Sequence, residues 1–246
     1  MLDDETPGNV EDAEEMMQLV ARDLRDAETV PRLDDAAVSS PDARIEGRNE
    51  EKKLAVSARE GDTEAFAELM RRRTPGVLAF LRRMLGDAED ARDVAQLTFL
   101  KAWENLARYD SSWAFSTWLF RIAGNLAIDA LRARGTRSRT EAENFRLVRG
   151  GRGVADPEGP MGLEREEVRR VFEACATVLS EKQRLVFVLR EFEEKESAEI
   201  AVILDCREST VRNHLFQARK LLRDEIRQRF PEFLPKGSVP AREDRA

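Results

Sequence analysis

The sequence predicts an all-α protein made of two small helical domains joined by a flexible linker. Apolar residues recur at spacings of three and four over 53–134 and again over about 163–230, which is the period of amphipathic helices. Between these segments, residues 135–162 end in GRGVADPEGPMG, and this Gly- and Pro-rich composition is typical of a linker. Almost no segment has the strict alternation of a strand.

Composition limits the classes of protein to consider. The chain has 246 residues, of which 41% are hydrophobic, enough to form one large or two small cores. No segment approaches the roughly 20 consecutive apolar residues of a transmembrane helix. The N-terminus, MLDDETPGNVEDAEEMM, is acidic and lacks the basic and apolar regions of a secretory signal. We therefore expect a cytoplasmic protein.

The sequence contains too few metal ligands for a zinc site of the Cys/His type. Cys175 and Cys206 are isolated in sequence, and His214 is the only histidine. We expect no metal and no cofactor. Both cysteines are expected to be small core residues, with redox sensing as the alternative.

The formal charge of −7 is concentrated at the N-terminus. Residues 1–50 hold 15 acidic and 5 basic residues, a net of −10, which leaves a net of +3 for 51–246. This extension contains one short amphipathic pattern, Met16, Met17, Val20 and Leu24, and is predicted to be mostly disordered. It is either a solvated tail or a regulatory segment that shields a DNA-binding surface or docks on a partner.

The first predicted domain, 51–134, begins with two helices separated by a capped turn. Gly61-Asp62-Thr63 supplies an N-cap, and the apolar stripe that follows is expected to be bent or broken at Pro75. Gly86-Asp87 ends this helix and caps the next one.

The next predicted helix has apolar residues on two opposite faces, and each face could pack against another helix or protein. One face is a regular core pattern: Ala91, Val94, Ala95, Thr98, Phe99, Ala102, Trp103 and Leu106. The opposite face carries Asp93, Gln96, Leu97, Leu100, Lys101 and Glu104. Exposed leucines there require either a partner protein or a neighbouring helix of the same domain.

Aromatic, guanidinium and amide groups are concentrated in the segment that follows. Tyr109 and all three tryptophans, Trp103, Trp113 and Trp118, fall within 16 positions. On a helix starting near Ser116, one face is expected to be buried: Leu119, Ile122, Ala123, Leu126, Ala127 and Ala130. The opposite face carries Trp118, Arg121, Asn125, Asp129 and Arg132. Single-stranded nucleic acid is bound by rings that stack on bases, amides that read base edges and cations that contact phosphates. The alternative is that the tryptophans fill the core beside a solvated charged face.

The second predicted domain, 163–230, has the pattern of a helix-turn-helix motif at 197–216. Helical segments are expected at 164–178, 181–192, 197–204 and 208–223, with a tight turn at Asp205-Cys206-Arg207. Ala201 lies ten residues before Val211 and is small enough for close helix packing. In the last helix, Ser209, Thr210, Arg212, Asn213, Gln217 and Lys220 face outward, the residue types that contact bases and phosphates in a major groove. A helical hairpin with a solvated polar face is the alternative.

These motifs, in this order, resemble the sigma-70 family, specifically its extracytoplasmic-function (ECF) group with only the second and fourth conserved regions. The resemblance covers about 52–229. DVAQLTFLKAW at 93–103 is similar to the polymerase-core-binding motif, FSTWLFRIAGNLAIDALR at 115–132 to the promoter-melting segment, and SAEIAVILDCRESTVRNHLFQARKLL at 197–222 to the helix-turn-helix. The linker's EAENF, 141–145, resembles the same stretch in the envelope-stress sigma factors of enteric bacteria.

The resemblance implies a non-catalytic subunit that directs RNA polymerase to promoters. Its partners would be the clamp helices of the largest core subunit, the flap region, promoter DNA and an anti-sigma protein, with no small-molecule substrate. The core would be bound by Asp93, Gln96, Leu97, Leu100 and Lys101. The melted −10 element would be bound by Tyr109, Trp113, Phe115, Trp118, Arg121, Asn125, Asp129 and Arg132. The −35 duplex would be read by Arg207, Ser209, Thr210, Arg212, Asn213, Gln217 and Lys220.

Several positions depart from the family pattern. Leu97 stands where an acidic residue is usual, and Ser209 replaces a common glycine but could still cap its helix. His214, Phe216 and Gln217 replace a more basic stretch, which predicts fewer phosphate contacts. The acidic residues 1–50 have no counterpart in the minimal family pattern. Residues 231–246 are predicted to be a C-terminal tail outside both domains.

Two other classes of protein remain to be distinguished by experiment. A dimeric helix-turn-helix regulator would bind duplex DNA tightly without polymerase and would have no use for the aromatic face. An enzyme would need a phosphate-binding loop, a metal-ligand set or a nucleophile with its base, and none of these patterns is present.

Overall fold

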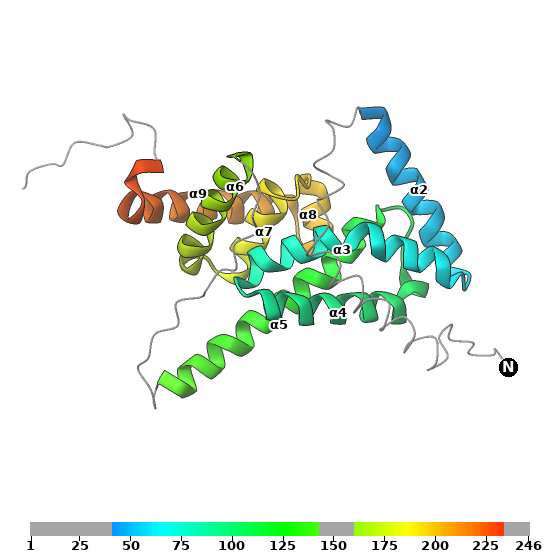
Figure 1. Ribbon diagram of the computed structural model, residues 1–246, viewed down its shortest axis with the longest axis horizontal. Helices are drawn as coiled ribbons and strands as arrows, with labels where there is room; N and C mark the ends of the chain where they lie inside the picture. Colours follow the sequence, from blue (N-terminus) through cyan, green and yellow to red (C-terminus); the bar gives the residue numbers. More distant parts are fainter. Residues whose placement is uncertain (1–40, 143–159, 234–246) are drawn as a thin grey trace, which may run out of the picture.

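The computed structural model describes residues 41–142 and 160–233, and within these ranges the chain is helical (Figure 1). The N-terminal domain consists of α2 (Pro41–Arg59), α3 (Thr63–Leu85), α4 (Ala88–Glu104), the short η2 (Leu106–Arg108) and α5 (Phe115–Ala142). The C-terminal domain consists of α6 (Pro160–Cys175), η3 (Ala176–Val178), α7 (Glu181–Glu191), α8 (Ser197–Leu204), α9 (Glu208–Arg229) and η4 (Pro231–Phe233). The prediction of an all-α protein with two helical regions is confirmed.

The predicted turns of the N-terminal domain form as expected. The Asp62 carboxylate accepts a hydrogen bond from the Ala65 N–H at 3.0 Å and caps α3. Gly86 ends α3 with a φ of +70°, a left-handed conformation that glycine adopts without strain. Asp87 then caps α4 by accepting from the N–H groups of Glu89 and Asp90.

The predicted break at Pro75 is absent, because α3 is a single helix from Thr63 to Leu85. Proline removes one backbone hydrogen bond from a helix interior. Here α3 packs on α2, α4 and α5, so buried side chains lie on both sides of Pro75, including Met70 and Val77. This packing outweighs the loss of one hydrogen bond.

The helix-turn-helix of the C-terminal domain is also confirmed. A capping box between Ser180 and Gln183 starts α7. Asp205 adopts a left-handed φ of +52° in the turn between α8 and α9, and the Cys206 N–H donates to the Ala201 carbonyl at 3.0 Å. Ala201 and Val211 are both buried, as their spacing predicts.

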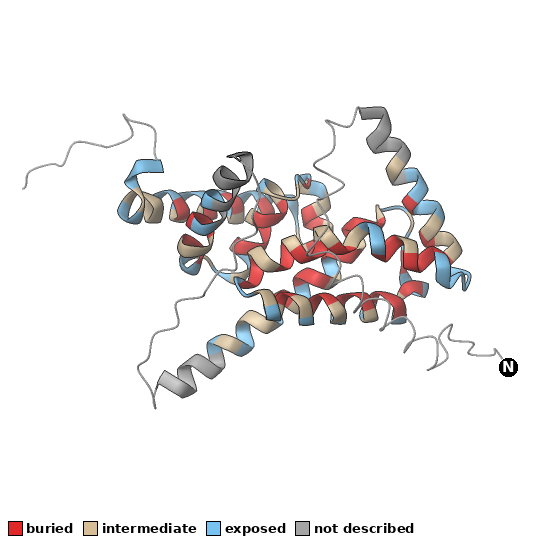
Figure 2. Cartoon of the chain, viewed as in Figure 1, coloured by how far each residue is buried: buried red, intermediate tan, exposed pale blue. Residues whose placement is uncertain are grey.

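The two domains pack against each other, which the sequence did not predict. α8 and α7 contact α5, and α7 contacts α3. Buried apolar residues of both domains form one continuous cluster, visible as the red ribbon through the middle of Figure 2. Phe120 and Ile128 of α5 are also buried, although they lie outside the stripe predicted for that helix, and the Phe120 ring packs on Phe80 of α3.

Element bounds differ from the predicted domain limits at three places. α2 begins at Pro41, within the predicted N-terminal extension. α5 continues to Ala142 and α6 begins at Pro160, so both helices enter the segment 135–162 that we expected to be a linker. The amphipathic pattern at Met16–Leu24, most of that linker and residues 234–246 lie outside the described residues. Among the helices described, none is long and apolar enough to cross a membrane.

Candidate nucleic-acid interface

The outward face of α4 presents apolar and charged side chains together. Leu97 is 45% exposed, on a helix whose opposite face is buried. Asp93 and Lys101 beside it are exposed, and Gln96 and Leu100 are half-buried. Among residues 41–142 and 160–233 no neighbouring helix covers Leu97 fully, so the second of the two sequence-based interpretations, coverage within the domain, does not apply to this leucine.

The buried face of α4 packs on the rest of the domain and fixes the position of the outward face. All of its predicted core positions are buried, from Ala91 to Trp103. Trp103 packs on Phe66 of α3, with ring centroids 5.0 Å apart. Such aromatic pairs stabilise by about 0.5–1.5 kcal/mol beyond the burial of their area. The outward leucines therefore lie on a rigid helix.

The loop between η2 and α5 is held by three aromatic rings. Tyr109, Phe115 and Trp118 contact one another with ring centroids 5.5–5.7 Å apart. The Tyr109 hydroxyl donates a hydrogen bond to the Trp113 carbonyl at 2.8 Å, which fixes the loop from inside. Burial raises the pKa of this phenol, so it stays protonated and able to donate.

The tip of the loop is ordered by a second local contact. The Asp110 carboxylate accepts from the N–H of Ser112 at 2.9 Å and from its hydroxyl at 2.7 Å. These two bonds hold the pKa of Asp110 below its ordinary value. Trp113, next in the chain, is 37% exposed at the surface of the loop.

Burial divides the aromatic residues that were predicted to touch single-stranded DNA. Tyr109 and Phe115 are each only 2% exposed, so in this conformation they support the loop and do not reach a base. Trp118 is half-buried, and Trp113 is exposed. Trp103 belongs to the core, as the alternative interpretation proposed for the tryptophans.

The outward face of α5 continues from this loop as a row of polar side chains. Arg121, Asn125, Asp129 and Arg132 are all exposed on it. Arg132 lies 3.9 Å from the Asp129 carboxylate, and Arg121 lies 3.9 Å from Asp205 at the end of α8. Ion pairs this long on exposed groups are weak. The Arg121 guanidinium can therefore exchange its partner for a phosphate.

The outward face of α9 has the chemistry of a DNA-reading helix. Val211, Leu215, Ala218 and Leu222 are buried, and this turns a polar row to the solvent. Exposed on it are Ser209, Arg212, Asn213 and Lys220, together with Arg207 just before the helix, whereas Thr210 and Gln217 are half-buried. Arg207, and not Ser209, occupies the N-cap position, and it makes no side-chain capping bond. Ser209 therefore does not cap α9, although the sequence suggested that it could.

Phe216 was not among the predicted DNA-binding residues, although it is 65% exposed on α9. It follows buried Leu215 and lies three and four residues from Asn213 and Lys220, on the same face. An aromatic residue at an outward position of a recognition helix is the sequence signal that could have identified it.

The described residues contain no group of three or more His, Cys, Asp or Glu side chains that could hold a metal ion. Cys175 is buried and Cys206 half-buried, and both are free thiols. Burial raises the pKa of each thiol, which favours the unreactive protonated form.

Comparison with known proteins identifies both domains. Residues 69–137 match the model for sigma-70 region 2, and residues 169–222 match that for sigma-70 region 4. The chain is 34% identical over 179 residues to the RNA polymerase sigma-H factor of Pseudomonas aeruginosa, covering 71% of this chain and 93% of that protein. It is 34% identical to the ECF RNA polymerase sigma-E factor of Escherichia coli, covering 70% and 92%. It is 32% identical to the ECF sigma factor SigW of Bacillus subtilis, covering 72% and 96%.

The fold is also similar to a solved structure. CnrH, in complex with the cytosolic domain of CnrY, superposes with a TM-score of 0.53 at 25% sequence identity. The match covers 73% of this chain and 99% of CnrH.

Proposed function

Because the chain belongs to the sigma-70 family, in the ECF group of RNA polymerase sigma factors, we propose that it directs core polymerase to promoters through three separate surfaces. It is a transcription initiation factor of the sigma class. The three surfaces are the outward face of α4, the loop and outward face of α5, and the outward face of α9.

The face of α4 binds the clamp helices of the largest core subunit. Exposed Leu97, with half-buried Leu100 beside it, supplies the apolar centre, and Asp93 and Lys101 supply a charged rim. Protein interfaces commonly have this arrangement of an apolar centre and a polar rim. Gln96 contributes a side-chain amide at the edge.

The loop and face of α5 hold the melted −10 element. Trp113 stacks on an unpaired base, the Asn125 amide reads a base edge, and Arg121 and Arg132 contact phosphates, with Asp129 and Trp118 beside them. Stacking on an aromatic side chain contributes about 1–3 kcal/mol per base, which offsets the few kcal/mol needed to unstack it. Tyr109 and Phe115 act by holding the loop.

The face of α9 reads the −35 element as duplex. Arg212 and Lys220 contact phosphates or guanine edges, Asn213 and Gln217 read bases, and Ser209 and Thr210 position the helix on the backbone. Phe216 adds an apolar contact, of the kind that recognises a thymine methyl group.

The rigid loop with exposed Trp113 at its surface, directly joined to the polar face of α5, is the observation that best supports this proposal. A regulator that reads only duplex DNA has no need for such a loop. We assign 51–134 to core binding and melting, 135–162 to the linker, and 163–230 to −35 reading. The segments 1–50 and 231–246 lie outside these functions.

The chain carries out no catalysis of its own and acts in the cytoplasm, on the nucleoid once it is part of the holoenzyme. Its flap contact lies on the C-terminal domain. An anti-sigma protein regulates it by binding; CnrH, which is similar in fold, forms a complex with another protein, the cytosolic domain of CnrY.

Permanganate footprinting tests the melting function. Purified core polymerase, this chain and a supercoiled promoter plasmid should give thymines around −10 that react only when all three are present. A footprint that is absent with every promoter tested would contradict the proposal.

A further inference from the structure

The most exposed aromatic side chain among the described residues lies at the centre of a basic surface on α9. Phe216 is 65% exposed. Arg212 and Lys220 lie four residues to either side of it and Arg223 seven residues on, so all three stand within about 40° of Phe216 around the helix. All three are exposed. We call these four residues the α9 patch.

The fold leaves the cations of the α9 patch largely without partners. Arg212 lies 3.5 Å from the Glu208 carboxylate, and both side chains are at least half exposed, so this pair contributes little to stability. In the described part of the chain, Lys220 and Arg223 form no ion pair. A positively charged surface with a ring at its centre fits a ligand that is both acidic and apolar.

The sequence of residues 11–26, which precede the described part of the structure, has both of these properties. The segment holds six acidic and two basic residues, a net charge of −4. At helical spacing, four apolar residues share one side of it: Met16, Met17, Val20 and Leu24. Methionine sulfur also packs favourably on aromatic rings. The segment therefore offers carboxylates to the cations of the α9 patch and apolar side chains to Phe216.

Charge selects α9 among the three outward faces. No acidic residue lies between Ser209 and Arg223 of α9. The outward face of α5 carries Asp129 among its cations, and that of α4 carries Asp93 beside Leu97. Carboxylates on those two faces repel an acidic segment, whereas the α9 patch attracts it.

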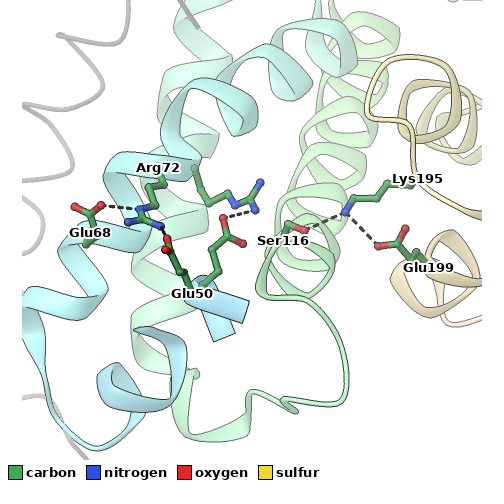
Figure 3. A network of polar contacts seen from close by, with 8 residues as sticks. Glu50, Glu68, Arg72, Ser116, Lys195 and Glu199 are labelled. Atoms are coloured by element: carbon green, nitrogen blue, oxygen red, sulfur yellow. Dashed lines mark hydrogen bonds and ion pairs between the residues drawn. The ribbon is translucent and has the colours of Figure 1, made fainter. Parts of the chain in front are cut away.

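The tether is long enough for the segment to reach α9. Glu50 of α2 pairs with Arg72 near the middle of α3 at 3.1 Å, as Figure 3 shows. The end of α3 contacts α7 through Arg83 and Arg184, and α7 packs on α9. Figure 1 shows α2 and α9 on the same side of α3, whose 23 residues are about 35 Å long. Residues 25–40 span up to about 53–58 Å when extended, which exceeds the whole length of α3.

We propose that residues 11–26 bind the α9 patch of the same chain and cover it against duplex DNA until a −35 element displaces them. The inference rests on the proposed function for the DNA-reading role of α9, whereas the contact itself does not depend on that role. Two departures from the family pattern then have one explanation. The acidic extension and the exposed ring of Phe216 are the two halves of one contact.

The tether makes even a weak contact sufficient. A short tether holds the segment at an effective concentration of about 1 mM, so a contact with a Kd of about 0.1 mM is occupied roughly nine-tenths of the time. Duplex DNA then finds only about one-tenth of the patches uncovered, and its apparent affinity falls about tenfold.

Photo-cross-linking in the full chain tests whether the segment docks. A benzoylphenylalanine replaces Met17, and in the control chain it replaces Val38, which lies between the segment and α2. We expect the residue at position 17 to form a cross-link to 208–223 of the same molecule, and the residue at position 38 to form none there. Cross-links to other segments, cross-links between two copies only, or no cross-link from position 17 would overturn the proposal.

A second pair of variants tests the part that Phe216 plays in the contact. In the chain with the photoreactive residue at position 17, Phe216→Asp should lower the yield of the α9 cross-link several-fold, because a carboxylate replaces the ring and repels the segment. Phe233→Asp makes the same change at another exposed phenylalanine and should leave the yield unchanged. Equal yields from the two variants would contradict a contact centred on Phe216.

Duplex binding by the full chain without polymerase tests whether docking covers the patch. Val20→Ser with Leu24→Ser removes two apolar side chains from the segment without changing its charge, and Leu33→Ser with Val38→Ser does the same outside it. We expect the first chain to bind a short duplex of mixed sequence about tenfold more tightly than the second. Equal affinities would show that the segment does not cover α9. If neither chain binds duplex, the proposed DNA-reading role of α9 fails, while the cross-link still decides whether the segment docks.

Discussion

The Arg184 guanidinium of α7 donates two hydrogen bonds to the backbone carbonyl of Arg83, from Nε at 2.9 Å and from Nη2 at 2.7 Å. The last carbonyls of an α-helix have no partner within the helix, and Arg83 lies in the last turn of α3. Arg184 thus caps a helix of the other domain. Burial lowers the pKa of Arg184 to about 10, which still leaves it cationic at neutral pH.

Replacing Arg184 by Met should destabilise the protein. The change removes the one charged donor of this carbonyl, and a hydrogen bond to a charged group contributes roughly 1.5–3 kcal/mol. We expect the free energy of unfolding, measured with urea, to fall by about 2–3 kcal/mol. Arg223→Met, at an exposed position of α9, is the control and should change little. Equal effects of the two substitutions would mean that the Arg184 contact contributes nothing to stability.

Trp113→Ala should impair promoter opening. Loss of one stacking contact of about 1–3 kcal/mol corresponds to a decrease of roughly 5- to 150-fold in the open-complex equilibrium constant. Permanganate reactivity of the −10 thymines measures this change, and Trp113→Phe, which keeps a ring, should retain most of the reactivity. If Ala and Phe behave alike, Trp113 does not stack on a base.

Asn125→Ala should also impair opening while leaving core binding intact. The side chain is exposed on α5, away from the predicted core-binding face of α4, so its loss removes contacts to a base and not to polymerase. Core affinity and permanganate reactivity are measured on the same preparation. Unchanged melting would remove Asn125 from the site.

Phe216→Ala should weaken −35 recognition. Burying this exposed ring against a thymine methyl group contributes about 1–2 kcal/mol, which is roughly 5- to 30-fold in affinity. The measurement is duplex binding by holoenzyme with matched and altered −35 sequences. Phe233→Ala, an exposed phenylalanine in η4, is the control. Equal losses for both variants would argue against a specific contact.

Acidification should strengthen −35 binding through His214, the only histidine of the chain. Burial, with a smaller contribution from Lys182, lowers the pKa of His214 below 6.5, so the ring is neutral at pH 7. Below that pKa it gains a positive charge on a helix that faces phosphates. We expect the affinity of holoenzyme for −35 duplex to rise as the pH falls from 7.5 to 5.5.

His214→Gln is the control for this effect and should make binding independent of pH over the same range. The effect on stability has the opposite sign, because the unfolded chain binds the proton more tightly than the folded one. The free energy of unfolding should therefore fall as the pH drops from 6.5 through the lowered pKa. An affinity for −35 duplex that rises equally with acidification in both proteins, or that does not rise in the unmodified protein, would exclude His214 as the cause.

Helix periodicity predicted those parts of the fold that depend on neighbouring residues. Phe99 is buried and Leu97 exposed on α4, and Val211 is buried on α9, as spacings of three and four require. The helix N-caps at Asp62 and Asp87 could also be predicted from the sequence, because capping depends only on a short local segment.

Contacts between distant segments could not be predicted in the same way. α7 and α8 pack on α5, and nothing in the sequence of α5 indicates that second partner. Phe120 and Ile128 are buried on α5 although they lie outside its predicted stripe. Tyr109 and Phe115 flank a loop, which has no helical periodicity from which burial could be predicted. Both rings are buried in a cluster with Trp118 that forms only in the folded chain.

Run-off transcription with purified core polymerase on a library of genomic fragments tests the central claim most directly. We predict specific start sites with the intact chain, and their loss with Leu97→Asp, which places a charge at the exposed centre of the α4 face. Leu97→Met, which keeps the apolar contact, should retain them. The account would be contradicted by a chain that gives no start sites and does not bind core, yet binds specific duplex DNA by itself. That result would identify a dimeric regulator instead.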